Sequence, residues 1–327
     1  IYIIKMLIKN ISRINKKILH TGKVPLFPRI KDPNKASEAL YEVLISKEPC
    51  MIARYGATEL MCIINYLGVK RGKPNILRYL LGLEEDWWWR ESSLKQIEQW
   101  SGFFPATIPN VEAFCELILN DSQYVDILAS WLKDEYKLKD YLHAKSFIQG
   151  LFLDPFWSEN PWTKALQNKK VLVVHPFAQL IESQYNEKRE HLFKNPNILP
   201  KFQLKTIKAI QSLGGVNNGF KDWFEALKYM ENEIDSCDYD ICLLGCGAYG
   251  FPLAAHIKRT GKKAVHIGGS LQLLFGIIGK RWEDPNYGSL ELGGKGFYPK
   301  LINEFWIRPG INNKPLNAQQ VEAGCYW

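Results

Sequence analysis

The chain has 327 residues, an apolar fraction of 46% and a formal net charge of +8. This length can bury a large core in one large or two modest domains, and the apolar fraction is typical of a globular protein. No run of 18 or more apolar residues occurs, so the sequence predicts no transmembrane helix.

The excess positive charge lies near the N-terminus. Eight basic residues precede the first acid, Asp32, and they equal the whole net charge, so residues 32–327 are balanced. A nucleic-acid enzyme more often spreads its basic surface over the body, so we expect no nucleic-acid partner. The seven cysteines are scattered and odd in number, which favours reduced thiols and a cytoplasmic location.

Residues 1–20 have the periodicity of a basic amphipathic helix. At about 100° per residue, one face carries Ile4, Leu7, Ile8, Ile11, Ile14 and Ile18, and the opposite face carries Lys5, Lys9, Arg13, Lys16 and Lys17. One interpretation is an element attracted to anionic lipid at the inner face of the cell membrane. The other is an ordinary helix that packs its isoleucines on the body. A signal peptide is disfavoured because lysines interrupt the apolar stretch.

The segment from Pro49 to Leu60 predicts an apolar strand, a glycine bend and then an amphipathic helix. In an open α/β sheet such junctions lie at the carboxyl ends of strands, where ligands bind. A carboxylate in the first helical turn is favoured by the helix dipole, and it either pairs with a nearby arginine or serves a ligand. The candidate donor-binding residues of this junction are Arg54, Tyr55, Gly56 and Thr58, and Glu59 is a candidate catalytic residue.

Residues 70–165 are rich in aromatic side chains, with helical stretches and little strand pattern, so we expect a helical insertion or cap. Further strands are predicted at residues 171–174, 241–244 and 264–267, each followed by a helix. Alternating strands and helices predict a mostly parallel sheet with helices on both faces, an α/β fold of the Rossmann-like kind.

The predicted organisation has three parts. An arm and linker take residues 1–34, a single Rossmann-like catalytic domain takes residues 35–310, and a C-terminal tail takes residues 311–327. The aromatic-rich insertion interrupts the domain at about residues 70–165.

The second junction matches the pattern G-x-G-x-x-G between a strand and a helix, which lets backbone approach a pyrophosphate. A dinucleotide site also needs an acid at the end of the next strand, and that strand ends in His266 and Ile267 instead. This difference disfavours NAD and S-adenosylmethionine. A close helix–strand contact without a ligand stays open as an alternative. The candidate donor-binding residues here are Gly245, Gly247, Tyr249, Gly250, Gly268 and Gly269.

Further candidates follow other predicted strands. His175 ends a strand, where it suits a general base or a phosphate hydrogen-bond donor, although a structural role is an alternative. Gln272, Arg281 and Glu283 follow the last predicted strand. Arg281 is suited to holding a phosphate with two hydrogen bonds, and Glu283 is a second candidate base.

The first junction, Arg54-Tyr55-Gly56-Ala57-Thr58-Glu59, resembles the Arg-Phe-Gly-Asp-Gly-Glu segment of GT-D type bacterial glycosyltransferases. The block from Gly245 to Gly269 is similar to the second half of that family. The resemblance covers roughly residues 40–70 and 165–285, and it implies transfer of a sugar from a nucleotide diphosphate sugar to a glycan or lipid-linked acceptor in surface polysaccharide synthesis.

In that family an Asp-x-Glu motif serves the donor and a divalent metal, Mn²⁺ or Mg²⁺. The glutamate carries over to Glu59, whereas Ala57 stands where the family has aspartate. A single carboxylate is a poor site for a hard cation. We therefore expect Arg54, His175 or Arg281 to neutralise the leaving diphosphate.

Two other functions remain open from the sequence. One is an NAD- or S-adenosylmethionine-dependent Rossmann enzyme that uses the glycine loop. The other is a non-catalytic scaffold in envelope assembly, which would bind no nucleotide and would tolerate loss of Arg54 and Glu59.

Overall fold

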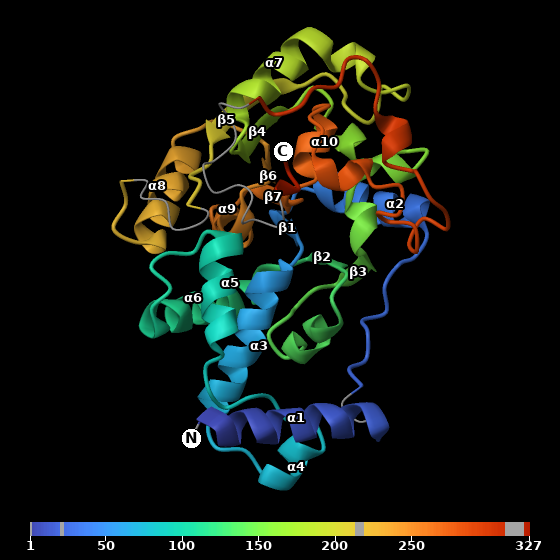
Figure 1. The fold of residues 1–327 in the computed structure, drawn as a ribbon. Helices are drawn as coiled ribbons and strands as arrows, with labels where there is room; N and C mark the ends of the chain where they lie inside the picture. The colour runs from blue at the N-terminus through green and yellow to red at the C-terminus, as the bar shows by residue number, and fades with distance from the viewer. Residues whose placement is uncertain (1, 20–22, 213–218, 311–323) are drawn as a thin grey trace.

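A sheet of seven parallel strands forms the centre of the protein, in the order β3-β2-β1-β7-β6-β4-β5 (Figure 1). The computed structural model describes residues 2–19, 23–212, 219–310 and 324–327. The strands are β1 (Cys50–Ala53), β2 (Ile127–Ser130), β3 (Ser146–Gln149), β4 (Lys170–His175), β5 (Gln203–Lys208), β6 (Ile241–Leu244) and β7 (Lys263–His266). The α/β class predicted from the sequence is confirmed.

Alternate residues of the central strands enter two separate apolar cores. In β4, Leu172 and Val174 join one core, whereas Val171 and Val173 join the other. This alternation follows from the period of two along a strand. Both faces of the sheet are therefore covered, which explains why these strands are continuous apolar runs in the sequence.

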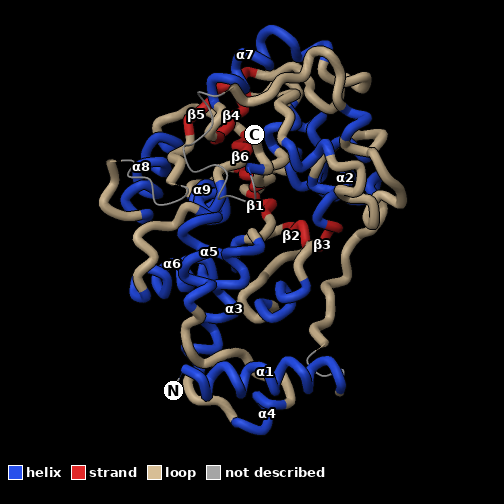
Figure 2. The backbone as a smooth tube through the Cα atoms, in the orientation of Figure 1, coloured by secondary structure: helices blue, strands red, loops and turns tan. Residues whose placement is uncertain are grey.

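The helices lie on both sides of the sheet (Figure 2), and they divide between the two cores. Helices α3 (Ala57–Arg71), α5 (Glu91–Ser101), α6 (Ile108–Asp121), α8 (Trp223–Asp235) and α9 (Gly250–Arg259) contribute to the first. Helices α2 (Pro33–Ile45), α7 (Ala178–Lys188) and α10 (Leu271–Leu274) contribute to the second. The helices that follow β1 and β6 thus lie on one face, and those that follow β4 and β7 lie on the other. Such a change of side opens a crevice at the carboxyl ends of the strands.

We expected a helical insertion or cap at residues 70–165, but this mostly helical segment is also part of the sheet. The segment supplies β2 and β3, which extend the sheet beyond β1. Asp126 interrupts the apolar residues just before β2, and Phe147 and Ile148 are the two apolar residues of β3, so no long apolar run marks either strand. The predicted linker also takes part, because Ile30 pairs with Ile148 along the outer edge of β3. Of the predicted tail, residues 311–323 lie outside the described residues.

The basic arm forms α1 (Tyr2–Ile18), and it packs on α4 (Ile76–Leu80) at the far end of α3 from the sheet (Figure 1). The alternative in which the isoleucines pack on the body is wrong for Ile11, Ile14 and Ile18. Their side chains are 47%, 54% and 68% exposed. Among the described residues, no helix is long and apolar enough to cross a membrane.

Candidate active site

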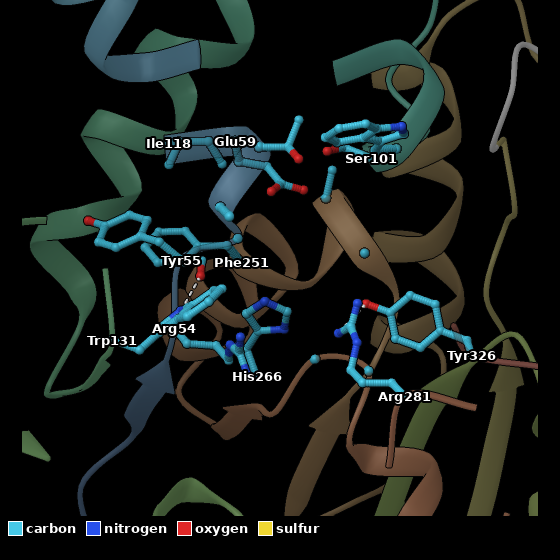
Figure 3. A pocket seen from close by; sticks show the side chains of 18 residues that line it. Arg54, Tyr55, Glu59, Ser101, Ile118, Trp131, Phe251, His266, Arg281 and Tyr326 are labelled. Atoms are coloured by element: carbon cyan, nitrogen blue, oxygen red, sulfur yellow. Dashed lines mark hydrogen bonds between the residues drawn. The ribbon is translucent and has the colours of Figure 1, made fainter. Parts of the chain in front are cut away.

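A cavity of about 140 Å³ lies at the carboxyl ends of β1, β2 and β7 (Figure 3). Both junctions singled out in the sequence reach it, because Glu59 and Gly247 line the same cavity. Its wall also contains seven further predicted residues: Arg54, Tyr55, Gly56, Thr58, Gly268, Gly269 and Arg281. The structure therefore brings together side chains and backbone that are up to 227 positions apart in the sequence.

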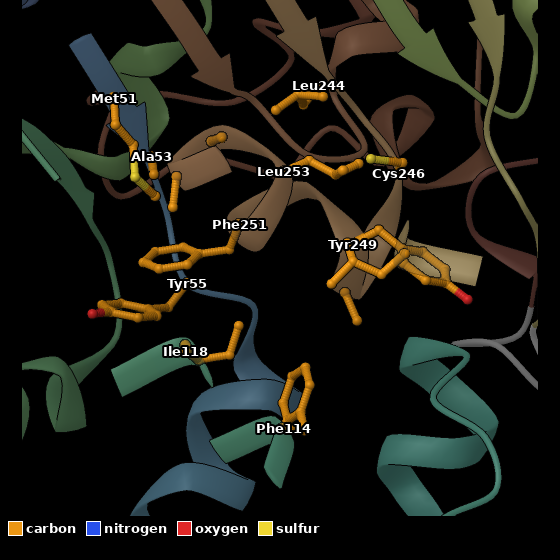
Figure 4. Close-up of a cluster of buried hydrophobic side chains, with 14 of the residues drawn as sticks. Met51, Ala53, Tyr55, Phe114, Ile118, Leu244, Cys246, Tyr249, Phe251 and Leu253 are labelled. Carbon is orange, nitrogen blue, oxygen red and sulfur yellow. The ribbon is translucent and has the colours of Figure 1, made fainter. Parts of the chain in front are cut away.

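An aromatic contact holds the two junctions together. Tyr55 follows β1 and is buried, and its ring stacks on Phe251 in α9 with the ring centroids 4.8 Å apart (Figure 4). The Tyr55 hydroxyl lies 2.6 Å from Ser122 Oγ, so the polar end of the side chain also has a partner. Tyr55 therefore fixes the position of the junction, and its hydroxyl is engaged by Ser122.

The carboxylate of Glu59 folds back over the start of its own helix. Gly56 is the N-cap of α3, and a Cβ built there would lie 1.9 Å from Glu59 Oε2. Burial raises the pKa of Glu59, while its own backbone N–H, the Ser101 hydroxyl and the charge of Arg54 oppose that rise. The site thus holds one carboxylate whose affinity for a proton is higher than usual.

Gly56→Ala tests whether this close approach positions the carboxylate. The backbone of Gly56 has φ −77°, which alanine adopts without strain, so only the added methyl group matters. We expect an unchanged melting temperature, and activity lower by roughly 10- to 100-fold because the carboxylate is displaced. Gly310→Ala is the matched control, since a methyl group added there would meet nothing within 4 Å among the described residues. Equal activity of the two variants would contradict the positioning role.

Arg54 is held by an aromatic ring. Its guanidinium lies 4.6 Å from the centroid of the Trp131 ring, and Trp131 in turn donates a hydrogen bond of 2.9 Å from Nε1 to the Tyr55 carbonyl. Within the described part of the chain, no carboxylate lies within ion-pairing distance of Arg54. The guanidinium is thus oriented by stacking, and its charge is left to act on the cavity.

A buried carboxyl group lies near Arg54. Asp154 accepts hydrogen bonds from Ser270 and Tyr298, which satisfy both of its oxygens. Burial raises the pKa of Asp154, and these two hydrogen bonds and the charge of Arg54 oppose the rise. Asp154 is absent from the cavity wall, so it belongs to the support of the site.

The glycine loop has divided roles. Gly247 has φ +58° and lines the cavity, in a conformation that glycine adopts without the cost of a side chain. Gly250 instead packs against His266, because a Cβ there would lie 2.2 Å from the imidazole Nδ1. Tyr249 is buried, and it stacks on Trp223 with the ring centroids 4.9 Å apart. Gly247 therefore remains a candidate for ligand binding, whereas Gly250 and Tyr249 lie in the core.

Gly268 and Gly269 form the part of the wall that follows β7. Gly268 has φ +80°, and a Cβ built there would lie 3.7 Å from Cδ of Arg54. At Gly269, a Cβ would lie 2.1 Å from the Tyr326 ring. Gly268 is thus favoured by its positive φ, whereas the absence of a side chain at Gly269 lets the Tyr326 ring approach the backbone closely.

A second cavity of about 110 Å³ adjoins the first and is mostly apolar. It lies at the ends of β4 and β6, and the two cavities share Trp100, Gly247, Gly269 and Tyr326. His175, Gly245 and Gln272 line it, together with Phe177 and Trp327. The two cavities are therefore neighbours in the crevice, which has a polar half and an aromatic half.

His175 lines this second cavity, and its ring offers a hydrogen-bond donor. Its Nδ1 accepts a hydrogen bond of 3.0 Å from the backbone N–H of Phe177, so the ring proton of the neutral form is on Nε2. Burial lowers the pKa of His175 to about 3. The Nδ1 lone pair of the neutral ring already accepts this hydrogen bond, so it is not available to accept a proton. The role of general base predicted for His175 therefore does not fit this geometry.

Glu283 does not reach either cavity. It ends a short 3₁₀ helix, Lys280–Glu283, and forms an ion pair with Arg308 on the surface. Arg281, in the same short helix, turns the other way and lines the polar cavity. Its Nη1 lies 3.3 Å from the Tyr326 hydroxyl, and its Nη2 lies 2.9 Å from Cys325 Sγ.

Several wall residues were not predicted as site residues. They are Trp100, Ser101, Trp131, Tyr326 and Trp327, from segments with no motif, and His266, which precedes the predicted Gly268 and Gly269. His266 is the most unusual, since its Nδ1 is buried with no hydrogen-bond partner among the described residues. Burial, together with the nearby charge of Arg54, lowers the pKa of His266 to about 3. Its position at the end of a strand was the one sequence signal that could have identified it.

No protein-family model matches the chain, and no curated protein matches it. A solved structure that it resembles is described as the "selenomethionine substituted structure of domain of unknown function 1792". The two chains are 12% identical with a TM-score of 0.36, and the match covers 93% of this chain and 99% of the other. A similarity of this size supports no conclusion about activity, which rests on the residues of the site.

The residues of the cavity do not fit a divalent cation. Among the described residues Glu59 is the sole carboxylate in its wall, and Arg54 and Arg281 bring two positive charges to the same space. Within the described part of the chain, no group of three or more histidine, cysteine or acidic residues is arranged to hold a metal ion. Mn²⁺ and Mg²⁺ prefer several oxygen ligands, which this wall does not offer.

Proposed function

We propose that the protein is a glycosyltransferase that moves a sugar from a nucleotide diphosphate sugar to a hydroxyl group of a glycan or lipid-linked acceptor. The observation that carries the proposal is the composition of one cavity. Glu59, Arg54 and Arg281 line it together, and Gly247 and Gly268 bring bare backbone to the same space. The resemblance of residues 54–59 to a glycosyltransferase motif supports the same conclusion.

The reaction needs a base and a means of stabilising the departing phosphate. The Glu59 carboxylate accepts the proton of the acceptor hydroxyl, whose oxygen forms a bond to the anomeric carbon of the sugar. The bond from that carbon to the diphosphate breaks, and the electron pair leaves with the diphosphate. Arg54 and Arg281 neutralise its growing charge, which is the effect that preorganised cationic groups have in a partly buried site.

Two guanidinium groups take the place of a metal ion in this proposal. Arginine offers paired N–H donors that match phosphate oxygens, and it stays charged at any physiological pH. Arg54 is oriented by Trp131, and Arg281 by Tyr326 and Cys325. Turnover is therefore expected to survive treatment with a chelator such as EDTA.

The aromatic half of the crevice suits the planar base of the nucleotide. Trp100 and Tyr326 line both cavities, so a ligand with its phosphates near Arg281 has an aromatic surface next to it. The Nε2–H of His175 and the side chain of Gln211 supply polar contacts in that half. Stacking on an aromatic ring tolerates any base, and polar contacts then select among them.

Trp100→Ala tests this assignment. Trp100 is 38% exposed, so its removal costs the fold little. We expect KM for the donor to rise roughly ten-fold, the value of one lost base–aromatic stack, with kcat little changed. Tyr229→Ala is the control, because Tyr229 is an aromatic residue of similar exposure, 44%, outside both cavities. An unchanged KM in Trp100→Ala would show that the nucleotide base does not stack on Trp100.

The proposal as a whole is tested by a screen of ligands and donors. Purified protein is mixed with uridine, guanosine and thymidine diphosphates, with NAD and with S-adenosylmethionine, and its melting temperature is measured. Donor turnover is followed as release of the nucleoside diphosphate. We expect stabilisation by at least one nucleoside diphosphate and turnover of its sugar derivative. Stabilisation by NAD or S-adenosylmethionine alone, or by no nucleotide, would contradict the proposal.

A further inference from the structure

Helix α1 packs on the protein through its polar flank. Ser12 Oγ donates a hydrogen bond of 2.6 Å to the Tyr79 carbonyl, and Asn15 Nδ2 donates one of 2.8 Å to the Leu80 carbonyl. On the same flank, Lys9 Nζ lies 3.1 Å from Asp86. These three polar contacts fix how the helix is rotated about its axis.

This rotation leaves the apolar edge of α1 in solvent. Leu7, Ile11, Ile14 and Ile18 follow one another at helical spacing, and Leu7 is 57% exposed, comparable with the three isoleucines. The neighbouring α4 adds Ile76 and Leu77, also exposed. A helix normally buries such a stripe on the core, so a stripe kept outside indicates contact with something other than this chain.

The charge beside the stripe identifies the partner. Arg13 and Lys17 are exposed on α1, and residues 1–31 contain no acidic side chain. A second copy of the chain would bring the same basic side chains against each other, which is unfavourable. A surface that is apolar beneath and negatively charged on top satisfies both features, and that is the chemistry of an anionic lipid bilayer.

We propose that α1 and α4 form a membrane-binding face that lies in the interface of an anionic bilayer. Leu7, Ile11, Ile14 and Ile18 enter the boundary between headgroups and acyl chains, while Arg13 and Lys17 contact lipid phosphates. This inference does not depend on the proposed enzyme activity.

The same face would set the distance between the active site and the bilayer. Helix α3 begins beside the cavity at Ala57 and ends at Arg71, shortly before α4. With a rise of 1.5 Å per residue, this helix spans roughly 20 Å. The crevice would therefore stand about one helix length from the lipid surface.

The experiment compares binding of the full chain to two kinds of vesicle by flotation. One kind is pure phosphatidylcholine, and the other contains equal parts phosphatidylcholine and phosphatidylglycerol. We expect binding to the anionic vesicles alone, weakened by added salt. Replacing the stripe in Ile11→Ser/Ile14→Ser/Ile18→Ser is expected to lower partitioning by at least roughly 100-fold. Arg13→Gln/Lys17→Gln is expected to lower it by roughly 10- to 30-fold.

Matched controls separate this face from general stickiness. Ile45→Ser/Ile108→Ser/Leu290→Ser removes exposed apolar side chains elsewhere, and Lys47→Gln/Lys169→Gln removes exposed charge elsewhere. Both are expected to bind like the wild type, and circular dichroism checks that all variants are folded. Equal binding to the two vesicle types, or equal losses in the controls, would overturn the proposal. So would a dimer in sedimentation velocity without lipid that the serine variant abolishes.

Measuring donor turnover in solution tests the proposed enzyme activity separately from membrane binding. The serine variant of α1 is expected to turn over a soluble donor at the wild-type rate, since none of its changed residues lines a cavity. Loss of vesicle binding with turnover retained would support the membrane face, whether or not the acceptor is a lipid.

Discussion

Glu59→Gln is expected to lower kcat for sugar transfer by roughly 10²- to 10⁴-fold, the usual contribution of a positioned general base. The amide keeps the shape of the side chain and its contacts with the start of α3, but it cannot accept the acceptor proton. KM for the donor is expected to change little. The measurement is release of nucleoside diphosphate, followed over time at saturating donor.

The pH dependence gives this prediction a second measurement. Burial raises the pKa of Glu59 above its ordinary value of 4.5, and the carboxylate is the active form of a base. The wild-type kcat/KM is therefore expected to fall as pH is lowered through that raised pKa, at a higher pH than for an ordinary glutamate. The residual activity of Glu59→Gln is expected to lack this fall at low pH, which is the acid limb of the pH profile.

The same substitution is expected to stabilise the protein at neutral pH. A carboxyl group whose pKa is higher in the folded than in the unfolded state binds protons more tightly when folded. Its ionised form therefore weakens folding above that pKa, and the penalty disappears as pH falls below the ordinary value. We expect the melting temperature of Glu59→Gln to rise by roughly 1–3 °C at pH 7, as a gain below one kcal/mol would produce.

Glu283→Gln is the control for these measurements, because Glu283 lies on the surface paired with Arg308. It is expected to keep wild-type turnover and the acid limb. A large loss of turnover in Glu283→Gln with full activity in Glu59→Gln would contradict the assignment of the base.

The parts of the fold that the sequence predicted correctly are those with two buried faces. Strands β1, β4, β6 and β7 lie at or near the centre of the sheet. Each of β1, β4 and β6 contains four consecutive apolar residues, and β7 has Ala264 and Val265 at its centre. Strand β5 is an edge strand, and its residues Gln203–Lys208 alternate between exposed and half-buried. The lysines that protect such an edge from pairing also hide it from a search for apolar runs.

The site residues that lie within recognisable sequence motifs were predictable. Arg54, Glu59 and Gly247 belong to strand–loop–helix junctions, and such junctions meet at one edge of a parallel sheet. Trp100 and Tyr326 come from the end of a helix and from a segment beyond the last strand, so nothing local in the sequence places them there. Gly250 fits the glycine pattern, but its contact is with His266, and only coordinates distinguish the two roles.

Arg54→Gln is expected to lower kcat/KM by roughly 10- to 100-fold, the value of charged hydrogen bonds to a phosphate. Arg54→Lys keeps the charge but loses the paired N–H donors and the stacking on Trp131, so we expect it to recover part of the loss. Arg78→Gln is the matched control. Arg78 is an exposed arginine on the outer helix α4, and it forms an ion pair with Glu84. The measurement is initial-rate kinetics across donor concentrations, and wild-type kinetics in Arg54→Gln would refute a role in donor binding.

The pH profile of Arg54→Gln distinguishes an electrostatic role from a structural one. The charge of Arg54 lowers the pKa of both Glu59 and Asp154, which burial raises. Its removal is therefore expected to raise the pKa of Glu59 further and to move the acid limb of kcat/KM to higher pH, while Arg54→Lys leaves the limb near its wild-type position. A purely structural role would lower activity equally at every pH, since misplacing a side chain does not alter the proton affinity of its neighbour. An unshifted limb in Arg54→Gln would mean that Arg54 and Glu59 do not act on the same ligand space.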